Sequence, residues 1–162
     1  DAKRCVEGGR AMDGTHAVRV LLIDDDQDCA NSTAIILRHF GAEARTLSDP
    51  RLACDEALAF GPDLIMLDLG MPFLDGCAVA RQLRATEQLN ATRLVVVSGD
   101  ADPSHQALCA AAGFDDYLVK PVPLEQLVRL LAKAGAAKNA TEEPGPRHDL
   151  LHDRTGIEGA SP

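Results

Sequence analysis

The sequence predicts an α/β fold in which five parallel strands form a doubly wound sheet with helices on both faces. It contains five short apolar runs without polar alternation, which is typical of parallel strands buried on both faces. A segment with helical periodicity or helix-cap residues follows each run, and these units repeat about every 20–25 residues. The connections between neighbouring parallel strands should then be right-handed crossovers.

The composition agrees with one folded domain between two polar ends. The chain has 162 residues, of which 46% are hydrophobic but only 3% aromatic, so aliphatic side chains must build the core. We expect the domain to cover residues 18–135. Residues 1–17 lack periodicity and are predicted to be a disordered linker or vector-derived sequence, and residues 136–162 a flexible polar tail.

Several classes of protein are disfavoured by the same composition. The five cysteines are widely spaced without a C-x-x-C pair, so neither a disulfide framework nor a zinc site is predicted. No apolar run reaches the roughly 18 residues of a membrane span, and no signal peptide is found, which predicts a cytoplasmic location without membrane contact. The formal net charge of −9 disfavours direct binding of nucleic acid.

The first strand is predicted over residues 18–23, where a leucine and β-branched run ends at Asp24. Asp26 is the expected N-cap of the first helix, which Gly41 should end. A weaker strand is expected over residues 42–47. The apolar stripe of the first helix comprises Ala30, Thr33, Ala34, Leu37 and Phe40.

The second helix should begin with Asp49 as its N-cap and Pro50 in its first turn, and it should end at Gly61 and Pro62. An apolar strand over residues 64–68 follows and ends in Asp68. A Gly/Pro-containing loop then leads into a third helix over residues 76–85.

The last two strand–helix units follow the same pattern. A strand over residues 94–97 ends at Ser98, and a helix runs from Asp102 and Pro103 to Gly113. A short strand over residues 117–120 ends in Lys120. Pro123 opens the last helix, whose apolar residues recur at helical spacing: Leu124, Leu127, Val128 and Leu131.

Polar groups gather at the carboxyl ends of these strands, which meet at one edge of a parallel sheet. They are Asp24, Asp25, Asp68, Ser98 and Lys120. Carboxylates about 4 Å apart repel each other by about 4 kcal/mol at an effective dielectric near 20, so this cluster calls for a cation. Carboxylate and carbonyl oxygens suit Mg²⁺ better than zinc or copper. A carboxylate held by a metal and by the Lys120 ammonium can attack a phosphoryl group, which predicts aspartyl phosphate chemistry.

Four stretches carry a resemblance to a known family: residues 22–26, residues 66–72 with 75–76, residues 97–99, and residues 112–121. Together they make residues 18–134 similar to the receiver domain of two-component response regulators, the CheY-like domain. The resemblance implies a flavodoxin-like (βα)5 fold with strand order 2-1-3-4-5.

The resemblance also implies a role for each residue of the cluster. Asp68 would be the phosphoacceptor. The Mg²⁺ cofactor would bind Asp68, Asp25 directly and Asp24 largely through water, together with the backbone carbonyl of Gly70. Gly70 offers no side chain over the site, where many members carry a polar residue, so the rate of autodephosphorylation stays open.

Three further residues are implied to take part in switching. Lys120 would balance the charge of the phosphoryl group, and Ser98 occupies the position of the switch Ser/Thr. Tyr117 would be the aromatic residue that moves inward when Ser98 is drawn to the phosphoryl oxygens. The bond between Lys120 and Pro121 is expected to be cis, against about 5–6% of X-Pro bonds in folded proteins.

The implied partner is a sensor histidine kinase or a histidine phosphotransfer protein, whose phosphohistidine is the donor. The chain would not be an enzyme beyond its own phosphorylation and dephosphorylation. The stretches around residues 69–72 and 113–122 look most like receivers of hybrid sensor histidine kinases, and the absence of an initial Met favours a receiver cut from a larger protein. A stand-alone regulator and a phosphorylation-dependent dimer stay open.

Other interpretations of these residues were weighed. Residues 24–28 mimic a calcium loop, but Cys29 replaces the required Gly and Ile35 the Glu. A phosphatase of the haloacid-dehalogenase type would need an Asp-x-Asp-x-Thr pattern on the first strand, where Asp28 replaces the Thr. A receiver-like interaction module that is never phosphorylated is the remaining alternative. The five histidines have no partner spacing and are expected to be surface groups, none of them a phosphodonor.

Overall fold

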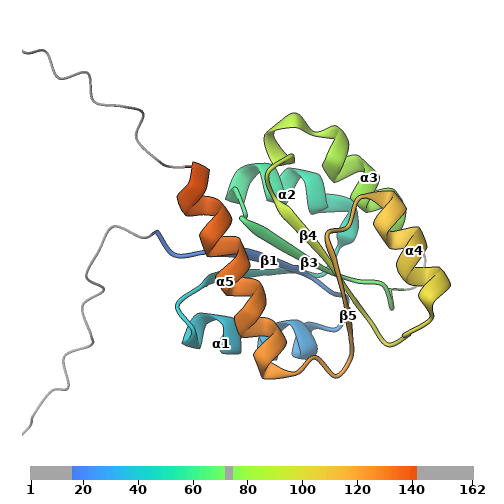
Figure 1. The fold of residues 1–162 in the computed structure, drawn as a ribbon, viewed down its shortest axis with the longest axis horizontal. Helices are drawn as coiled ribbons and strands as arrows, with labels where there is room; N and C mark the ends of the chain where they lie inside the picture. The colour runs from blue at the N-terminus through green and yellow to red at the C-terminus, as the bar shows by residue number, and fades with distance from the viewer. Residues whose placement is uncertain (1–15, 72–74, 142–162) are drawn as a thin grey trace, which may run out of the picture.

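The computed structural model describes residues 16–71 and 75–141. Five parallel strands form one sheet in the order β2-β1-β3-β4-β5, and helices cover both of its faces (Figure 1), so the predicted flavodoxin-like fold is confirmed. The elements are β1 (Arg19–Ile23), α1 (Gln27–His39), β2 (Glu43–Leu47), α2 (Ala53–Phe60), β3 (Leu64–Asp68), α3 (Gly76–Ala85), β4 (Arg93–Ser98), α4 (Pro103–Ala112), β5 (Asp116–Val119) and α5 (Leu124–Thr141).

The sheet divides the aliphatic core into two layers. Helices α2, α3 and α4 cover one face, and α1 and α5 cover the other (Figure 1). Successive residues of the fully buried strand β3 point to opposite layers, with Ile65 in the first and Met66 in the second. Burial on both faces explains why this strand is continuously apolar up to Asp68.

Strand register brings the polar strand ends together. Ile23 pairs with Leu67, so Asp24 and Asp68 leave neighbouring strands at the same height. On the other side of β3, Asp68 pairs with Val97, the residue before Ser98.

The predicted helix boundaries at capping residues are largely confirmed. The carboxylates of Asp26 and Asp102 accept backbone N–H bonds in the first turns of α1 and α4. Gly61 and Gly113 end α2 and α4 in the left-handed conformation. Asp49 instead caps a 3₁₀ turn (Pro50–Leu52), and the regular helix α2 begins only at Ala53. A second 3₁₀ turn (Glu87–Leu89) was not predicted.

Two predicted apolar stripes were partly wrong. Phe40 lies at the C-cap of α1, beyond its last helical residue, and is 46% exposed. On α5, Leu124 and Val128 are exposed, whereas Leu130 and Ala134 are buried beside Leu127 and Leu131. The buried stripe therefore starts three residues later than periodicity alone placed it.

Helix α5 continues through Gly135, the predicted end of the domain, to Thr141. The added turns consist mainly of good helix formers, and Lys138 donates to Asp63 at 3.1 Å. Residues 136–141, predicted to belong to the flexible tail over 136–162, are thus helical. Of the predicted linker over 1–17 and the predicted tail, residues 1–15 and 142–162 lie outside the described residues. None of the described helices is long and apolar enough to cross a bilayer.

Candidate functional site

Three carboxylates converge where β1 and β3 end. Asp24 and Asp25 follow β1, Asp68 is the last residue of β3, and one ligand atom from each lies within 4.8 Å of the others. Asp24 and Asp68 are buried, whereas Asp25 is exposed. The arrangement has buried carboxylates at its base and one at its opening, so it is accessible from one side.

Lys120 lies beside the two buried carboxylates. Its Nζ is 3.1 Å from Oδ2 of Asp68 and 3.6 Å from Oδ2 of Asp24. The backbone N–H of Lys120 donates to the Ser98 carbonyl at 2.8 Å, which fixes where its side chain leaves the sheet. Lys120 comes one residue after the end of β5, and its bond to Pro121 is cis, as the family resemblance implied.

The electrostatics of the cluster reflect this burial. Desolvation raises the pKa of Asp24, and a backbone hydrogen bond from Asp26 only partly opposes it. Burial alone would lower the pKa of Lys120, but the hydrogen bond and charge of Asp68, together with the charge of Asp24, raise it overall. Lys120 is therefore held as a cation, and one ammonium faces two buried carboxylates.

The remaining negative charge suits a hard divalent cation. Asp24, Asp25 and Asp68 offer only oxygen ligands, the donor set that Mg²⁺ prefers in proteins. The backbone N–H of Gly70 donates to Oδ1 of Asp68 at 2.9 Å. A Cβ at Gly70 would lie 3.2 Å from Oδ2 and 3.3 Å from Oδ1 of Asp68, so the absence of a side chain keeps the carboxylate accessible.

Ser98 and Tyr117 both contact the loop between β4 and α4. Ser98 is buried at the end of β4, and its Oγ accepts a hydrogen bond from the backbone N–H of Asp100 at 3.1 Å. The Tyr117 hydroxyl donates to the backbone carbonyl of Asp100 at 2.7 Å. The two predicted switch residues are thus linked through Asp100.

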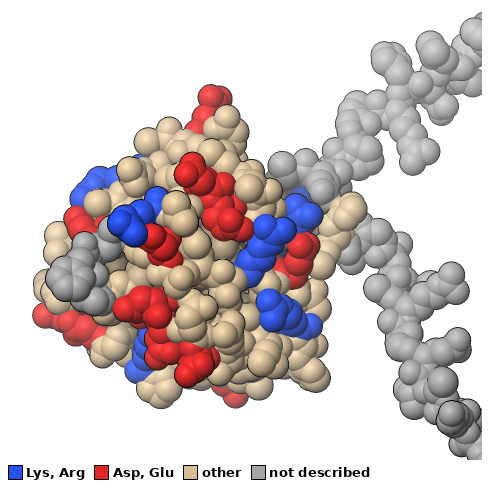
Figure 2. Space-filling view, turned by 180° about the vertical axis from the view of Figure 1, so that it is seen from behind, with Lys and Arg blue, Asp and Glu red and all other residues tan. Residues whose placement is uncertain are grey.

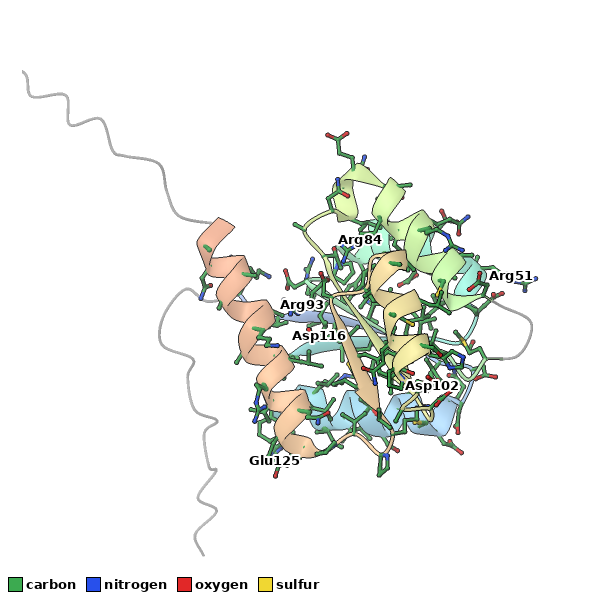
Figure 3. All side chains as sticks on the ribbon, turned by 45° about the vertical axis from the view of Figure 1, so that its right-hand side comes forward. Arg51, Arg84, Arg93, Asp102, Asp116 and Glu125 are labelled. Atoms are coloured by element: carbon green, nitrogen blue, oxygen red, sulfur yellow. The ribbon has the colours of Figure 1, made fainter. Side chains whose placement is uncertain are left out.

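The sequence interpretation missed Asp100 and His105. His105 is an exposed residue, as expected of the histidines, but its Nδ1 lies 2.6 Å from Oδ2 of Asp100, a partner that was not predicted. The two residues are five apart and span the start of α4, where Asp102 caps the helix (Figure 3). Since helical periodicity does not apply across a helix start, no spacing in the sequence indicated the pair.

Charged groups of both signs are mixed over the face shown in Figure 2, where Lys and Arg lie among Asp and Glu and do not merge into one basic surface. At the edge of the sheet, Arg93 pairs with Asp116 at 2.6 Å (Figure 3). Among the described residues, this face thus shows no continuous basic surface.

Comparison with known proteins gives a consistent result. The family described as the response regulator receiver domain matches residues 20–132. The transcriptional regulatory protein PrrA of Mycobacterium leprae is 38% identical over 134 residues, which are 80% of this chain and 57% of PrrA. The response regulator ArlR of Staphylococcus aureus is 30% identical over 145 residues, which are 88% of this chain and 65% of ArlR. The chain thus spans little more than half of its PrrA relatives.

Two solved structures share the fold. The chemotaxis response regulator CheY4 of Vibrio cholerae has a TM-score of 0.68 at 26% identity, covering 74% of this chain and 99% of CheY4. The receiver domain of the sensor histidine kinase PA1611 from Pseudomonas aeruginosa has a TM-score of 0.67 at 26% identity, covering 75% of this chain and 99% of that domain. The PA1611 domain holds a magnesium ion in its active-site cleft.

Proposed function

The chain belongs to the response regulator receiver domain family, and on that premise we propose that it accepts a phosphoryl group on Asp68. The observation that carries the proposal is the position of Asp68, a buried carboxylate 3.1 Å from the Lys120 ammonium and next to Asp24 and Asp25. This site can bind a cation, neutralise a phosphoryl group and present one carboxylate as a nucleophile.

In the proposed step, a carboxylate oxygen of Asp68 attacks the phosphorus of a phosphohistidine. The O–P bond forms as the N–P bond breaks, and the leaving imidazole nitrogen keeps the electron pair and takes a proton from water. Lys120 supplies positive charge to the transferring group. Bound Mg²⁺, held by Asp24, Asp25, Asp68 and the Gly70 carbonyl, would supply further neutralisation of the phosphoryl oxygens.

Phosphorylation would then change the populations of two conformations. The added group carries about −1.5 to −2 charges if it resembles a phosphate ester. Ser98 and Lys120 are drawn toward its oxygens, and Tyr117 rearranges with the β4–α4 loop, to which its hydroxyl and Ser98 are both bonded. The surface formed by α4, β5 and α5 would transmit the change to other proteins.

The proposed partner is a histidine kinase or a histidine phosphotransfer protein in the cytoplasm. Two contexts have support from the comparisons. PrrA and ArlR are regulators longer than this chain, whereas the PA1611 domain is part of a sensor histidine kinase. We favour the hybrid-kinase context because of the motif around residues 113–122. In a hybrid kinase this domain would not bind DNA itself. If phosphorylation promotes dimerisation, the dimer would form through the surface of α4, β5 and α5.

The test is incubation of the chain with acetyl phosphate and Mg²⁺, followed by intact mass and treatment with hydroxylamine. We expect one added phosphoryl group that hydroxylamine removes, as an acyl phosphate requires. Asp68→Asn should abolish the label, whereas Asp55→Asn, an exposed carboxylate on α2, should retain it. An unlabelled wild-type chain beside a labelled control receiver would show an inert module. Turnover of a phosphomonoester by Asp68→Asn would show a phosphatase.

A further inference from the structure

Asp100 makes four hydrogen bonds in the loop between β4 and α4. Its backbone N–H donates to Ser98 Oγ at 3.1 Å, and its carbonyl accepts from the Tyr117 hydroxyl at 2.7 Å. Its carboxylate accepts from the backbone N–H of Asp102 at 2.9 Å and lies 2.6 Å from His105 Nδ1. The backbone of this residue therefore meets both proposed switch residues, while its side chain is held by the start of α4.

Histidine is the residue type whose side chain can change charge near neutral pH, and His105 is the histidine of this network. It projects from the first turn of α4, and more than half of its side chain is exposed, so it contributes little to the core. Because the ring is exposed and its partner is a loop carboxylate, this short hydrogen bond restricts the conformation of the loop and not the packing of the core. A charge-assisted hydrogen bond is about twice as strong as a neutral one.

We propose that His105 is a positioning residue of the switch, which acts through Asp100 to hold the carbonyl of that residue toward the Tyr117 hydroxyl. Protonation of His105 strengthens the hold, and deprotonation weakens it. The ease with which Tyr117 and Ser98 rearrange therefore depends on pH over the physiological range. This role in switching rests on the proposed function. The hydrogen bond from the Tyr117 hydroxyl to the Asp100 carbonyl, however, is present in the unphosphorylated chain.

Acidic groups lie on more than one side of His105. Asp100 and Asp102 face it from its own loop, and the charge of His105 acts on Asp102. A cavity of about 500 Å³ separates α4 from the start of α3, and its lining includes His105, Asp75, Cys77 and Cys109. Among these lining and loop residues, His105 is the only one whose side chain can carry a positive charge.

The sequence offers a direct probe of the hydrogen bond between the Tyr117 hydroxyl and the Asp100 carbonyl, because Tyr117 is its only tyrosine and tryptophan is absent. Tyrosine emission from the unmodified chain reports on Tyr117 alone, and donation of its hydroxyl to a carbonyl quenches that emission. We expect the wild-type emission to fall as the pH is lowered from about 8 to about 5.5, with one midpoint in the range where histidine titrates.

Four variants separate the effect of His105 from other causes. His105→Asn keeps a neutral donor near Nδ1 that cannot titrate, so emission should stay near the wild-type level at pH 8 without a midpoint. His105→Leu removes the donor, so emission should be higher and equally flat in pH. His39→Asn, on α1, is the matched control and should keep the wild-type profile. Asp100→Asn should also lose the midpoint, because the acceptor no longer carries charge.

We expect the wild-type ratio of bonded to free Tyr117 to change about fivefold across the midpoint, the size expected when the donor to an ionised carboxylate changes from neutral to charged. A wild-type midpoint that persists in His105→Asn, or emission from His105→Leu equal to wild type at every pH, would overturn the proposal. Because no phosphodonor is present, failure here is independent of whether Asp68 accepts a phosphoryl group. Circular dichroism confirms that each variant remains folded.

Discussion

Lys120 Nζ lies 3.1 Å from Oδ2 of Asp68, closer than to the other buried carboxylate of the cluster. Lys120→Met would leave the transferring phosphoryl group without this charge, so labelling of Asp68 by acetyl phosphate should slow by about tenfold or more. The control is Lys133→Met on α5, whose ammonium lies 3.4 Å from Asp116, away from the acidic cluster. Equal labelling rates for Lys120→Met and wild type would contradict the role of Lys120.

Burial of Asp24 should make the contribution of this residue to the stability of the metal-free chain more favourable at low pH, where its carboxyl is protonated, than at neutral pH. Because desolvation raises the pKa of Asp24 above its ordinary value of 3.8, its contribution favours folding below that value and is lost as the pH rises through the raised one. At neutral pH, the ionised carboxylate therefore costs stability.

Asp24→Asn should accordingly raise the free energy of unfolding by about 1 kcal/mol at pH 7 without divalent ions, as measured by urea denaturation. The gain should shrink toward pH 4, and added Mg²⁺ should stabilise wild type more than the variant. Asp55→Asn, on the exposed surface of α2, should change stability little at any pH. A loss of stability in Asp24→Asn at pH 7 would refute the argument.

Gly70→Ala should hinder access to Asp68. The new Cβ would lie 3.2 Å from Asp68 Oδ2, closer than most such contacts in proteins, so the carboxylate or the loop must shift. We expect labelling by acetyl phosphate to slow by about threefold to tenfold, because a small misplacement of a nucleophile is costly. Gly99→Ala is the control, since a Cβ there meets no atom within 4 Å. Faster labelling of Gly70→Ala would show that the side chain does not obstruct the site.

Arg84 should contribute strongly to stability because it joins α3 to the segments flanking β4 and β5 (Figure 3). Its guanidinium donates to the carbonyls of Gly113 and Thr92 and to the carboxylate of Asp115, at 2.7–2.9 Å. Arg84→Met should lower the free energy of unfolding by about 2 kcal/mol, since two part-buried carbonyl groups lose their donor.

Arg81→Met tests whether that loss is specific to Arg84. Arg81 lies on the same helix, but its pair with Asp75 is exposed on both sides, so its removal should cost less than about 0.5 kcal/mol. Equal losses for the two variants in urea denaturation would mean that the bridging bonds of Arg84 add nothing.

Cys109 should resist alkylation in the folded chain. Burial, with a further contribution from Cys77, raises the pKa of Cys109 to about 11, so about one thiol in a thousand is ionised at pH 8. Iodoacetamide followed by peptide mapping should label Cys109 only after denaturation. Half-buried Cys77, on α3, provides the internal comparison and should be labelled first. Rapid labelling of Cys109 in the native chain would contradict its burial.

The parts of this molecule that depend on local sequence could be predicted. Asp26 and Gly61 mark helix ends through their own backbone and side-chain preferences. The continuous apolar run of β3 requires burial on both faces, which implies a parallel sheet and places Asp68 at its functional edge.

The parts that depend on tertiary contacts could not be predicted. The bonds of Arg84 join segments up to 31 residues apart, and no periodicity indicates them. Helix α5 passes through Gly135 because its other residues favour a helix and Lys138 finds Asp63 on a distant segment. Likewise, the polar pair of Asp100 and His105 forms across a loop and a helix start, where neither helical nor strand spacing applies.

The contact between Lys138 Nζ and the Ala17 carbonyl, 3.4 Å apart, brings the two ends of the described chain together at the opposite end of the sheet from Asp68. Domains with adjoining ends can be circularly permuted, because a short linker replaces the old termini without disturbing the core. New ends could be opened in the exposed turn at Asn90 and Ala91, which also lies away from the carboxylates. A permuted chain would carry a fused reporter at a position of choice while leaving the acidic cluster accessible.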